Sequence, residues 1–314
     1  MIVYSKLRYY QNMKKLIPFL SLSLLALTVG APTGSVSNGN SLQRSDSQLK
    51  PLPALARLNV LGGPRLVYDD SLEFQGQVQS LNWSGYAALG AAAGSVTTVS
   101  GSWIVNPVTG SSGQYAAVWV GIDGYDSSTV EQLGTLAEIT TTGFGRNAKT
   151  VVEYYAWYEM YPAGMYQIPL SITPGDSITA SVTWTPGTTS YKLYMIDNTS
   201  GKSWSGTFAG SSKAEQNSAE WIVEAPASNS GILPLADFGT EPFSACSATI
   251  GNTTGSISTC SAGDYEEITM VYEQQQGRKE TVTVEAQPSG LDTTGSIFGD
   301  TWESSGPTGF SFGF

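Results

Sequence analysis

The chain has 314 residues, of which only 13% are charged and none is histidine. Without histidine, catalytic mechanisms that use an imidazole base are excluded, and the commonest ligand of catalytic zinc is absent. Residues 1–74 contain eight Lys/Arg and four Asp/Glu, a net charge of +4. Residues 75–314 contain seven Lys/Arg and twenty-two Asp/Glu, a net charge of −15. The acidic part lacks the basic patches that phosphate contacts require, so we expect no nucleic-acid partner. No metal constellation or glycine-rich phosphate loop stands out, so we also expect no metal and no cofactor.

The N-terminus has the pattern of a secretion signal. Lys14 and Lys15 precede the apolar run LIPFLSLSLLALTVGA at 16–31, which ends in small residues. A basic flank, a run of this length and a small-residue exit are typical of a signal peptide, although the borderline length leaves an uncleaved membrane anchor as the alternative. We expect residues 1–31 to be a signal peptide, the protein to be secreted, and no stable membrane association after its removal.

A basic segment separates this signal from the acidic remainder of the chain. Between residues 44 and 65 there are four Lys/Arg and one Asp. A basic segment in this place indicates a prosegment at 32–77 that shields carboxylates until it is removed, and a disordered linker explains the composition equally well. The rest of the chain contains few Lys and Arg, so it gains only a small positive charge when its carboxyl groups are protonated in acid. Its self-repulsion in acid is therefore limited, and we expect it to act in an acidic extracellular environment.

From residue 78 to 314 the sequence predicts one all-β domain. Stretches such as YAAVWVGID, KTVVEYYAWYEMY and DSITASVTW are rich in β-branched and aromatic residues, alternate at period two, and are separated by Gly, Pro, Asn and Ser turns. No long amphipathic helix follows the signal. We therefore expect a single sandwich or barrel of permitted size, with an uncertain C-terminal tail.

The stretch QNSAEWIVEAP at 216–226 places two carboxylates in a strand. In an extended chain Glu220, Ile222 and Glu224 point to one side, whereas Ala219, Trp221 and Val223 point to the other. Four residues of strand separate the two acids by about 13 Å, so this pair does not fit the spacing of a retaining glycosidase.

Two cysteines, Cys246 and Cys260, lie fourteen positions apart downstream of the signal. In an oxidising compartment such a pair is more often bridged than free. We expect a disulfide that closes the loop between them.

Three ordered stretches, LNWSGYAA at 81–88, WVGIDGYDSSTVEQLGT at 119–135 and AEWIVEAP at 219–226, together resemble the glutamic peptidases, the eqolisin family of acid proteases. The similarity runs through most of residues 80–275. It implies an antiparallel β-sandwich of two bent sheets, concanavalin A-like, whose concave face holds the cleft. It also implies an acid endopeptidase that acts on protein or peptide substrates, which we expect to be a monomer.

The resemblance also assigns residues. It maps the catalytic dyad of the family to Gln132 and Glu220, and it maps supporting positions to Trp119 and Asp123. Glu224 and Trp83 are grouped with these as substrate-binding or supporting residues.

The side chain of an ordinary Glu has a pKa near ~4.3, so it is partly ionised in mild acid. On this basis we expect Glu220 to act as a general base toward water. The Gln132 amide, which does not titrate there, would donate to the oxyanion.

One departure and one rival interpretation remain open in the sequence. After Gln132 the chain reads LGTL, which places Leu133 after the Gln and Leu136 where better-known members of the family often have an acid, so the polarity of the cleft and the substrate preference stay open. The rival is a secreted carbohydrate-binding module, in which Trp157, Tyr158 and Tyr161 would stack on sugars.

Overall fold

The computed structural model describes residues 77–306, apart from 229–230, 262–263 and 277–278, together with three short backbone segments at 41–43, 50–51 and 66–67. The expected signal peptide at 1–31 lies outside the described residues, as does most of the expected prosegment at 32–77. Both boundaries therefore stay predictions. In the part of the chain that is described, no helix is long and apolar enough to cross a membrane.

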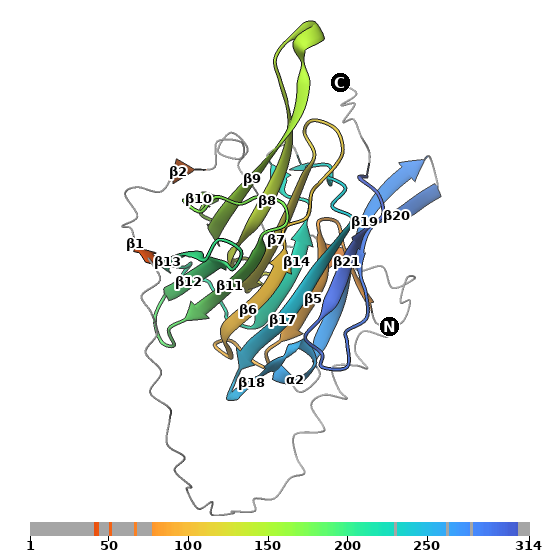
Figure 1. Cartoon of the computed structure of the whole chain (residues 1–314). Helices are drawn as coiled ribbons and strands as arrows, with labels where there is room; N and C mark the ends of the chain where they lie inside the picture. The colour runs from red at the N-terminus through yellow and green to blue at the C-terminus, as the bar shows by residue number, and fades with distance from the viewer. Residues whose placement is uncertain are drawn as a thin grey trace, which may run out of the picture. The chain divides into compact units, whose positions relative to one another are not determined.

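The described chain forms two layers of mainly antiparallel strands (Figure 1). The first layer contains, in spatial order, β13 (Lys202–Ala209), β12 (Ser190–Asp197), β11 (Ser177–Trp184), β6 (Val96–Ile104), β17 (Thr240–Ile250) and β18 (Thr253–Ser256). The centre of the second layer contains β10 (Tyr166–Ile168), β9 (Lys149–Tyr161), β8 (Val130–Thr142), β7 (Tyr115–Ile122), β14 (Ser218–Glu224), β5 (Trp83–Leu89) and β19 (Tyr265–Gln276).

The remaining elements extend these layers. Two strands continue the second layer beyond β19, namely β20 (Lys279–Pro288) and β21 (Phe298–Trp302), and a third, β4 (Gln77–Ser80), runs parallel to β19. Three short strands each pair with a longer one: β1 (Ser41–Gln43) with β13, β2 (Lys50–Pro51) with β10, and β3 (Leu66–Val67) with β4. A separate ribbon consists of β15 (Ala227–Ser228) and β16 (Gly231–Ile232). The helical pieces are the 3-10 turn η3 (Gly145–Asn147) and the helix α2 (Ile257–Cys260). The expected all-β class is confirmed.

One strand, β17, belongs to both layers. Its residues 240–243 pair with β21 in the second layer, and residues 244–250 pair with β6 in the first. The pairing register shifts between Ser244 and Ser247, where Ala245 has a positive φ of 50°. A local irregularity of this kind bends a strand and so lets it pass from one layer to the other.

The second layer buries both of its faces. On the inner face Ala219, Trp221 and Val223 join the core between the layers, and the Trp221 indole donates to the carbonyl of Ser100 in β6 at 2.8 Å. The other side, which we call the outer face, carries Ile222 in a second apolar cluster. The members of this outer-face cluster are Trp83, Ala87, Tyr115, Ala117, Trp119, Tyr125, Val130, Leu136, Trp157, Met165, Ile222 and Ile268. The alternation expected for residues 219–224 is confirmed.

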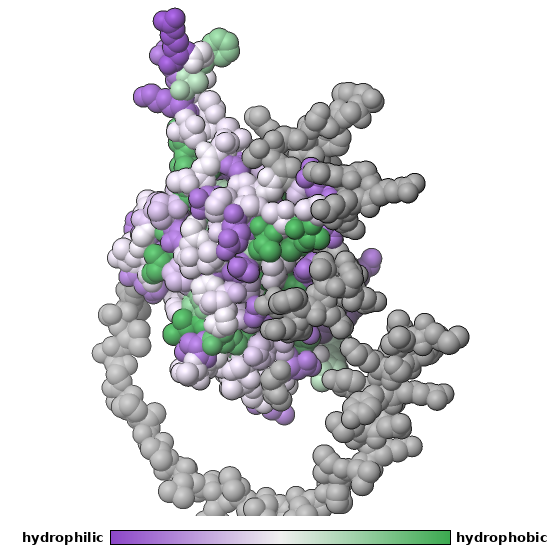
Figure 2. Space-filling model, turned by 90° about the vertical axis from the view of Figure 1, so that its right-hand side faces the viewer, coloured by the Kyte–Doolittle hydropathy of each residue, from purple (hydrophilic) through white to green (hydrophobic). Residues whose placement is uncertain are grey.

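The longest hairpin of the second layer, β8–β9, projects from the sandwich (Figure 1). Its tip carries Phe144, whose side chain is 94% exposed, and both apolar and hydrophilic side chains are visible there (Figure 2). The half of the hairpin nearer the sandwich is buried and contributes to the outer face.

The expected disulfide is wrong for this structure, because Cys246 and Cys260 are both free thiols. The pairing of β17 with β18, in which Ser247 faces Ser256, already closes the intervening loop. Each thiol is buried in the inner core and points to a nearby backbone carbonyl, at 3.8 Å for Cys246 and 3.7 Å for Cys260. A buried thiol of this kind packs as a small apolar group.

Reducing agent is therefore expected to leave the melting temperature unchanged. A thiol reagent added without reductant should titrate no cysteine in the native protein, because both thiols are buried, and two after unfolding. A fall in melting temperature on reduction, or the absence of titratable thiols in the unfolded chain, would show that the bridge exists.

Candidate functional site

Strand pairing places the two proposed dyad residues in one row across the outer face. Gln132 of β8 is opposite Gly121 of β7, and Gly121 is in turn opposite Glu220 of β14. Neighbouring strands are about 4.8 Å apart, so the backbones of Gln132 and Glu220 are about 10 Å apart with one strand between them. The full row, from β9 to β19, is Glu159, Gln132, Gly121, Glu220, Ala87 and Glu266.

Gly121 has no side chain, and the ring of Trp119, two residues earlier on β7, takes up the space above it between Gln132 and Glu220. A Cβ added at Gly121 would lie 2.8 Å from Cζ3 of Trp119 and 3.2 Å from Cβ of Gln132. The Trp119 ring therefore leans along β7 over Gly121. This indole forms the floor between the two polar side chains.

Glu220 is fully buried in this structure, and neither of its carboxyl oxygens has a hydrogen-bond partner among the described residues. Burial raises its pKa well above the ordinary range, and the nearby Ser218 hydroxyl, which does not reach hydrogen-bond geometry, lowers the pKa by less than burial raises it. The expectation that Glu220 has an ordinary pKa near ~4.3 is therefore wrong for this structure. An unpartnered buried carboxyl is costly, so a water or substrate group that reaches it gains a strong interaction.

Sequence reasoning missed Glu159, which belongs to the same row. Its Oε2 accepts a hydrogen bond from Nε2 of Gln132 at 2.9 Å, and both side chains are buried. Burial raises the pKa of Glu159 well above its usual range, and the charge of Glu224 adds to this. The alternation of Trp157, Glu159 and Tyr161 in the stretch YAWYEMYP could have identified it, because an acid between two aromatic residues on one strand face is unusual.

Glu224 lies two residues beyond Ile222 on the same outer face and is held by two donors. The Trp119 indole donates to its Oε2 at 2.8 Å, and the Asn82 amide donates to its Oε1 at 3.3 Å. Burial raises its pKa to about 7 against these hydrogen bonds. Trp83 packs edge-on against Trp119, with ring centroids 4.8 Å apart, so Trp83, Trp119 and Glu224 form one connected group.

Asp123 directly follows β7 and fixes the start of β14. Its carboxylate accepts backbone N–H bonds from Glu215 and Gln216 at 2.9 Å and from Asn217 at 3.0 Å. Burial raises its pKa, and the three bonds lower it. Because these donors immediately precede Ser218, the first residue of β14, Asp123 acts as a positioning residue for the strand that carries Glu220.

Several residues singled out from the sequence lie elsewhere. Leu133 faces the inner core and so does not affect the polarity of the outer face. Leu136 belongs to the outer-face cluster and makes that face less polar. The three aromatic residues of the carbohydrate-binding interpretation do not form a platform. Trp157 is fully buried, and Tyr158 points to the opposite face, where it stacks on Phe208 at 4.3 Å.

Buried carboxyl groups dominate the electrostatics of this part of the molecule. Among the described residues no group of three or more His, Cys, Asp or Glu is arranged to hold a metal ion. With Glu159, Glu220 and Glu224 all buried and their pKa values raised, the site is built to keep carboxyl groups neutral in acid. Neutral carboxyl groups can donate a proton or a hydrogen bond, so the arrangement is suited to acid–base chemistry.

Comparison with known proteins identifies the family. A model of the Peptidase A4 family matches residues 81–294, more than half of the chain. Aspergillopepsin-2 of Aspergillus niger is 31% identical over 231 residues, which cover 65% of this chain and 77% of that protein.

Two solved structures have a similar fold. Scytalido-glutamic peptidase, solved with a transition state analog inhibitor, matches with a TM-score of 0.56 and 26% identity over 71% of this chain and 98% of that chain. SCP-B, a member of the eqolisin family solved with the tripeptide Ala-Ile-His, matches with a TM-score of 0.52 and 25% identity at the same coverage. The chain therefore belongs to the Peptidase A4 (eqolisin) family and is a glutamic-type endopeptidase.

Proposed function

We propose that the protein is a secreted acid endopeptidase in which Glu220 and Gln132 hydrolyse a peptide bond with water as the nucleophile. The observation that carries this proposal is the row in which Gln132, Gly121 and Glu220 are directly opposite one another on three adjacent strands. Secretion rests on the N-terminal pattern, and acid operation rests on the family resemblance and on the small number of Lys and Arg in residues 75–314.

In the proposed reaction a water molecule lies between Glu220 and the scissile carbonyl, above the Trp119 ring that covers Gly121. Its hydrogen bonds to the two unpartnered oxygens of Glu220 favour the ionised carboxylate and oppose the effect of burial. Glu220 takes a proton from the water as the oxygen attacks the carbonyl carbon, and it later gives that proton to the leaving nitrogen. No acyl-enzyme forms.

Gln132 supplies the donor for the oxyanion. Its amide group carries two hydrogens, so one can stay bound to Glu159 while the other is available to the cleft. The floor formed by Trp119 excludes bulk water, and a donor in such an environment stabilises developing charge more than it would in solution.

The test of this function is cleavage of a denatured protein by the purified, processed chain at pH 3 to 4. Activity should persist with pepstatin, which inhibits pepsin-like aspartic proteases, and with a metal chelator. It should fall by roughly 10²–10³-fold in Gln132→Ala, the usual effect of losing one oxyanion donor. Retention on a glycan column without any cleavage would reject the peptidase in favour of a binding module.

Glu159 is proposed as the positioning residue for Gln132. Glu159→Ala removes the 2.9 Å hydrogen bond and should lower kcat roughly tenfold to a hundredfold, because small misplacements of a catalytic group are costly. Glu159→Gln keeps a neutral partner for the amide and should restore kcat at acidic pH. Since burial keeps wild-type Glu159 protonated in acid, the pH profile of Glu159→Gln should differ from that of wild type only on its high-pH side. Wild-type kcat in Glu159→Ala would rule this role out.

A further inference from the structure

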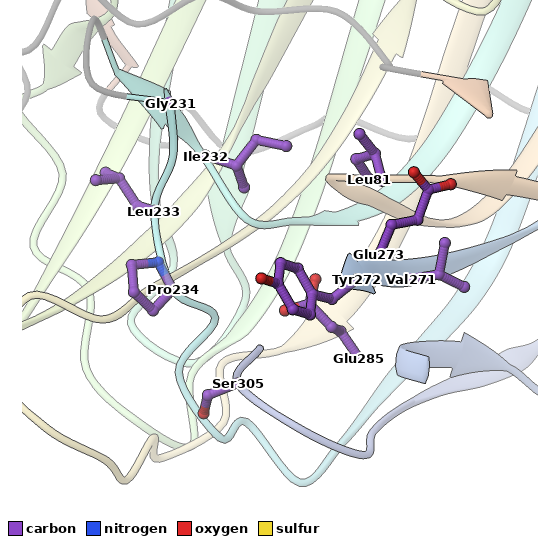
Figure 3. Close-up of a pocket in the computed structure, with 10 residues that line it drawn as sticks. All are labelled: Leu81, Gly231, Ile232, Leu233, Pro234, Val271, Tyr272, Glu273, Glu285 and Ser305. Carbon is purple, nitrogen blue, oxygen red and sulfur yellow. The ribbon is translucent and has the colours of Figure 1, made fainter. Parts of the chain in front are cut away.

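A pocket lies between residues 231–234 and the β19–β20 hairpin. Its volume is about 260 Å³. Leu233 and Pro234 line one side, Leu81 and Val271 line the other, and Tyr272 and Glu285 lie between them (Figure 3). A volume below the range of drug-sized ligand sites matches one large side chain better than a whole small molecule.

The lining of this pocket is mainly apolar, and the polar side chains on it are Glu285, Glu273, Tyr272 and Ser305. Leu81, Ile232, Leu233, Pro234 and Val271 contribute aliphatic surface to its walls. Glu285 is only 5% exposed. Burial raises the pKa of Glu285 to about 7, so the group is neutral in acid and does not repel an apolar occupant.

The pocket adjoins residues that contact the outer face. Leu81 adjoins Asn82, whose amide binds Glu224. The backbone N–H of Leu233 donates to the carbonyl of Pro226 at 2.9 Å, and its side chain packs against the outer-face cluster. Glu224 and Pro226 lie four and six residues after Glu220, about 13 and 20 Å along an extended strand. An extended peptide spans the same distance in four to six residues.

On the basis of the proposed function, we propose that this pocket is a remote specificity subsite that takes a large apolar side chain of the peptide substrate, four to six residues from the scissile bond. The contact of Leu233 with the outer-face cluster and the aliphatic walls of the pocket carry the assignment. Residues 307–314, which contain three phenylalanines and follow Gly306 beside Glu285, are the competing occupant.

The experiment compares cleavage of three synthetic peptides by the processed protein at pH 3 to 4. One peptide is short and extends three residues on each side of the scissile bond. Two longer peptides extend six residues and carry either Leu or Ala at the remote positions. Wild-type protein should cleave the Leu peptide with a kcat/KM about tenfold or more above that of the Ala peptide, mainly through KM.

Ile232→Trp, which fills the rim of the pocket, should remove this preference and leave cleavage of the short peptide unchanged. Ile297→Trp is the matched control, because Ile297 is exposed and lies outside the pocket. Equal cleavage of the Leu and Ala peptides by wild type overturns the subsite. So does a preference that emerges only after residues 307–314 are deleted, since the chain itself would then fill the pocket. Failure of wild type to cleave even the short peptide would instead reject the proposed function.

Discussion

Replacing Glu220 with Gln is expected to abolish peptide hydrolysis, with kcat falling by roughly 10³–10⁴-fold. Gln is nearly the same size, so the packing of β14 is kept, but it can neither accept the proton of the attacking water nor return it to the leaving nitrogen. General acid–base catalysis typically contributes 10²–10⁴-fold, and here one residue performs both transfers. Initial rates on a denatured protein at pH 3 to 4 measure the effect.

The control for this variant is Glu266→Gln. Glu266 is a carboxyl group in the same row, two strands from Glu220, with Ala87 between them. Its replacement should leave kcat within about threefold, and thermal unfolding should show that both variants are folded. Comparable activity in Glu220→Gln and wild type would refute the dyad, whatever the result for Gln132→Ala.

The second large effect concerns stability, which is expected to be high in acid and to be lost as the pH rises through 5 to 8. Burial raises the pKa values of Glu131 and Asp300 to about 8 and those of Glu224 and Glu285 to about 7. In the unfolded chain these groups titrate near ~4. A group whose pKa is higher in the folded state contributes full stability below its unfolded pKa and loses it as the pH rises toward the folded value.

The size of the effect decides whether the fold survives at neutral pH. Each such group weakens the folded state by about 1.4 kcal/mol per pH unit between its two pKa values. Over two pH units, four groups amount to a loss on the order of 10 kcal/mol, which is comparable to the total stability of a typical domain of about 5–15 kcal/mol. Chemical denaturation followed by tryptophan fluorescence at pH 3, 5, 7 and 8 measures the free energy of unfolding directly.

The Asp300→Asn variant measures how much one buried carboxyl group contributes to the loss of stability with rising pH. Asp300 is buried, its Oδ1 accepts the Ser84 hydroxyl at 2.8 Å, and it is opposite the buried Glu241 across the β17–β21 pair. The variant should lose less stability between pH 5 and 8 than wild type. Glu303→Gln, which changes an exposed carboxylate, should follow the wild-type curve. A stability that stays constant from pH 4 to 8 would contradict the role of buried carboxyl groups.

The sequence predicted the strand that carries Glu220 and the faces of its side chains, because period-two alternation is a local property. It could not predict that Glu220 is sealed from solvent, since burial depends on side chains from strands distant in sequence, such as Trp119. The bond between Gln132 and Glu159 depends on the register of β8 with β9, which the sequence does not state. The disulfide expectation failed for a related reason: spacing and compartment favour a bridge, but they do not say where two thiols lie in the core.

The strand shared by both layers has a mechanical consequence. Because β17 is hydrogen-bonded to β21 at one end and to β6 at the other, the layers cannot slide past each other without breaking those ladders. We therefore expect the sheet that carries Gln132 and Glu220 to stay rigid while a substrate enters. Different peptides would then be accommodated by the chain that follows β14, where the short β15–β16 ribbon takes the place of long strands. The protein would adapt at the edge of its site, and its reactive centre would stay in place.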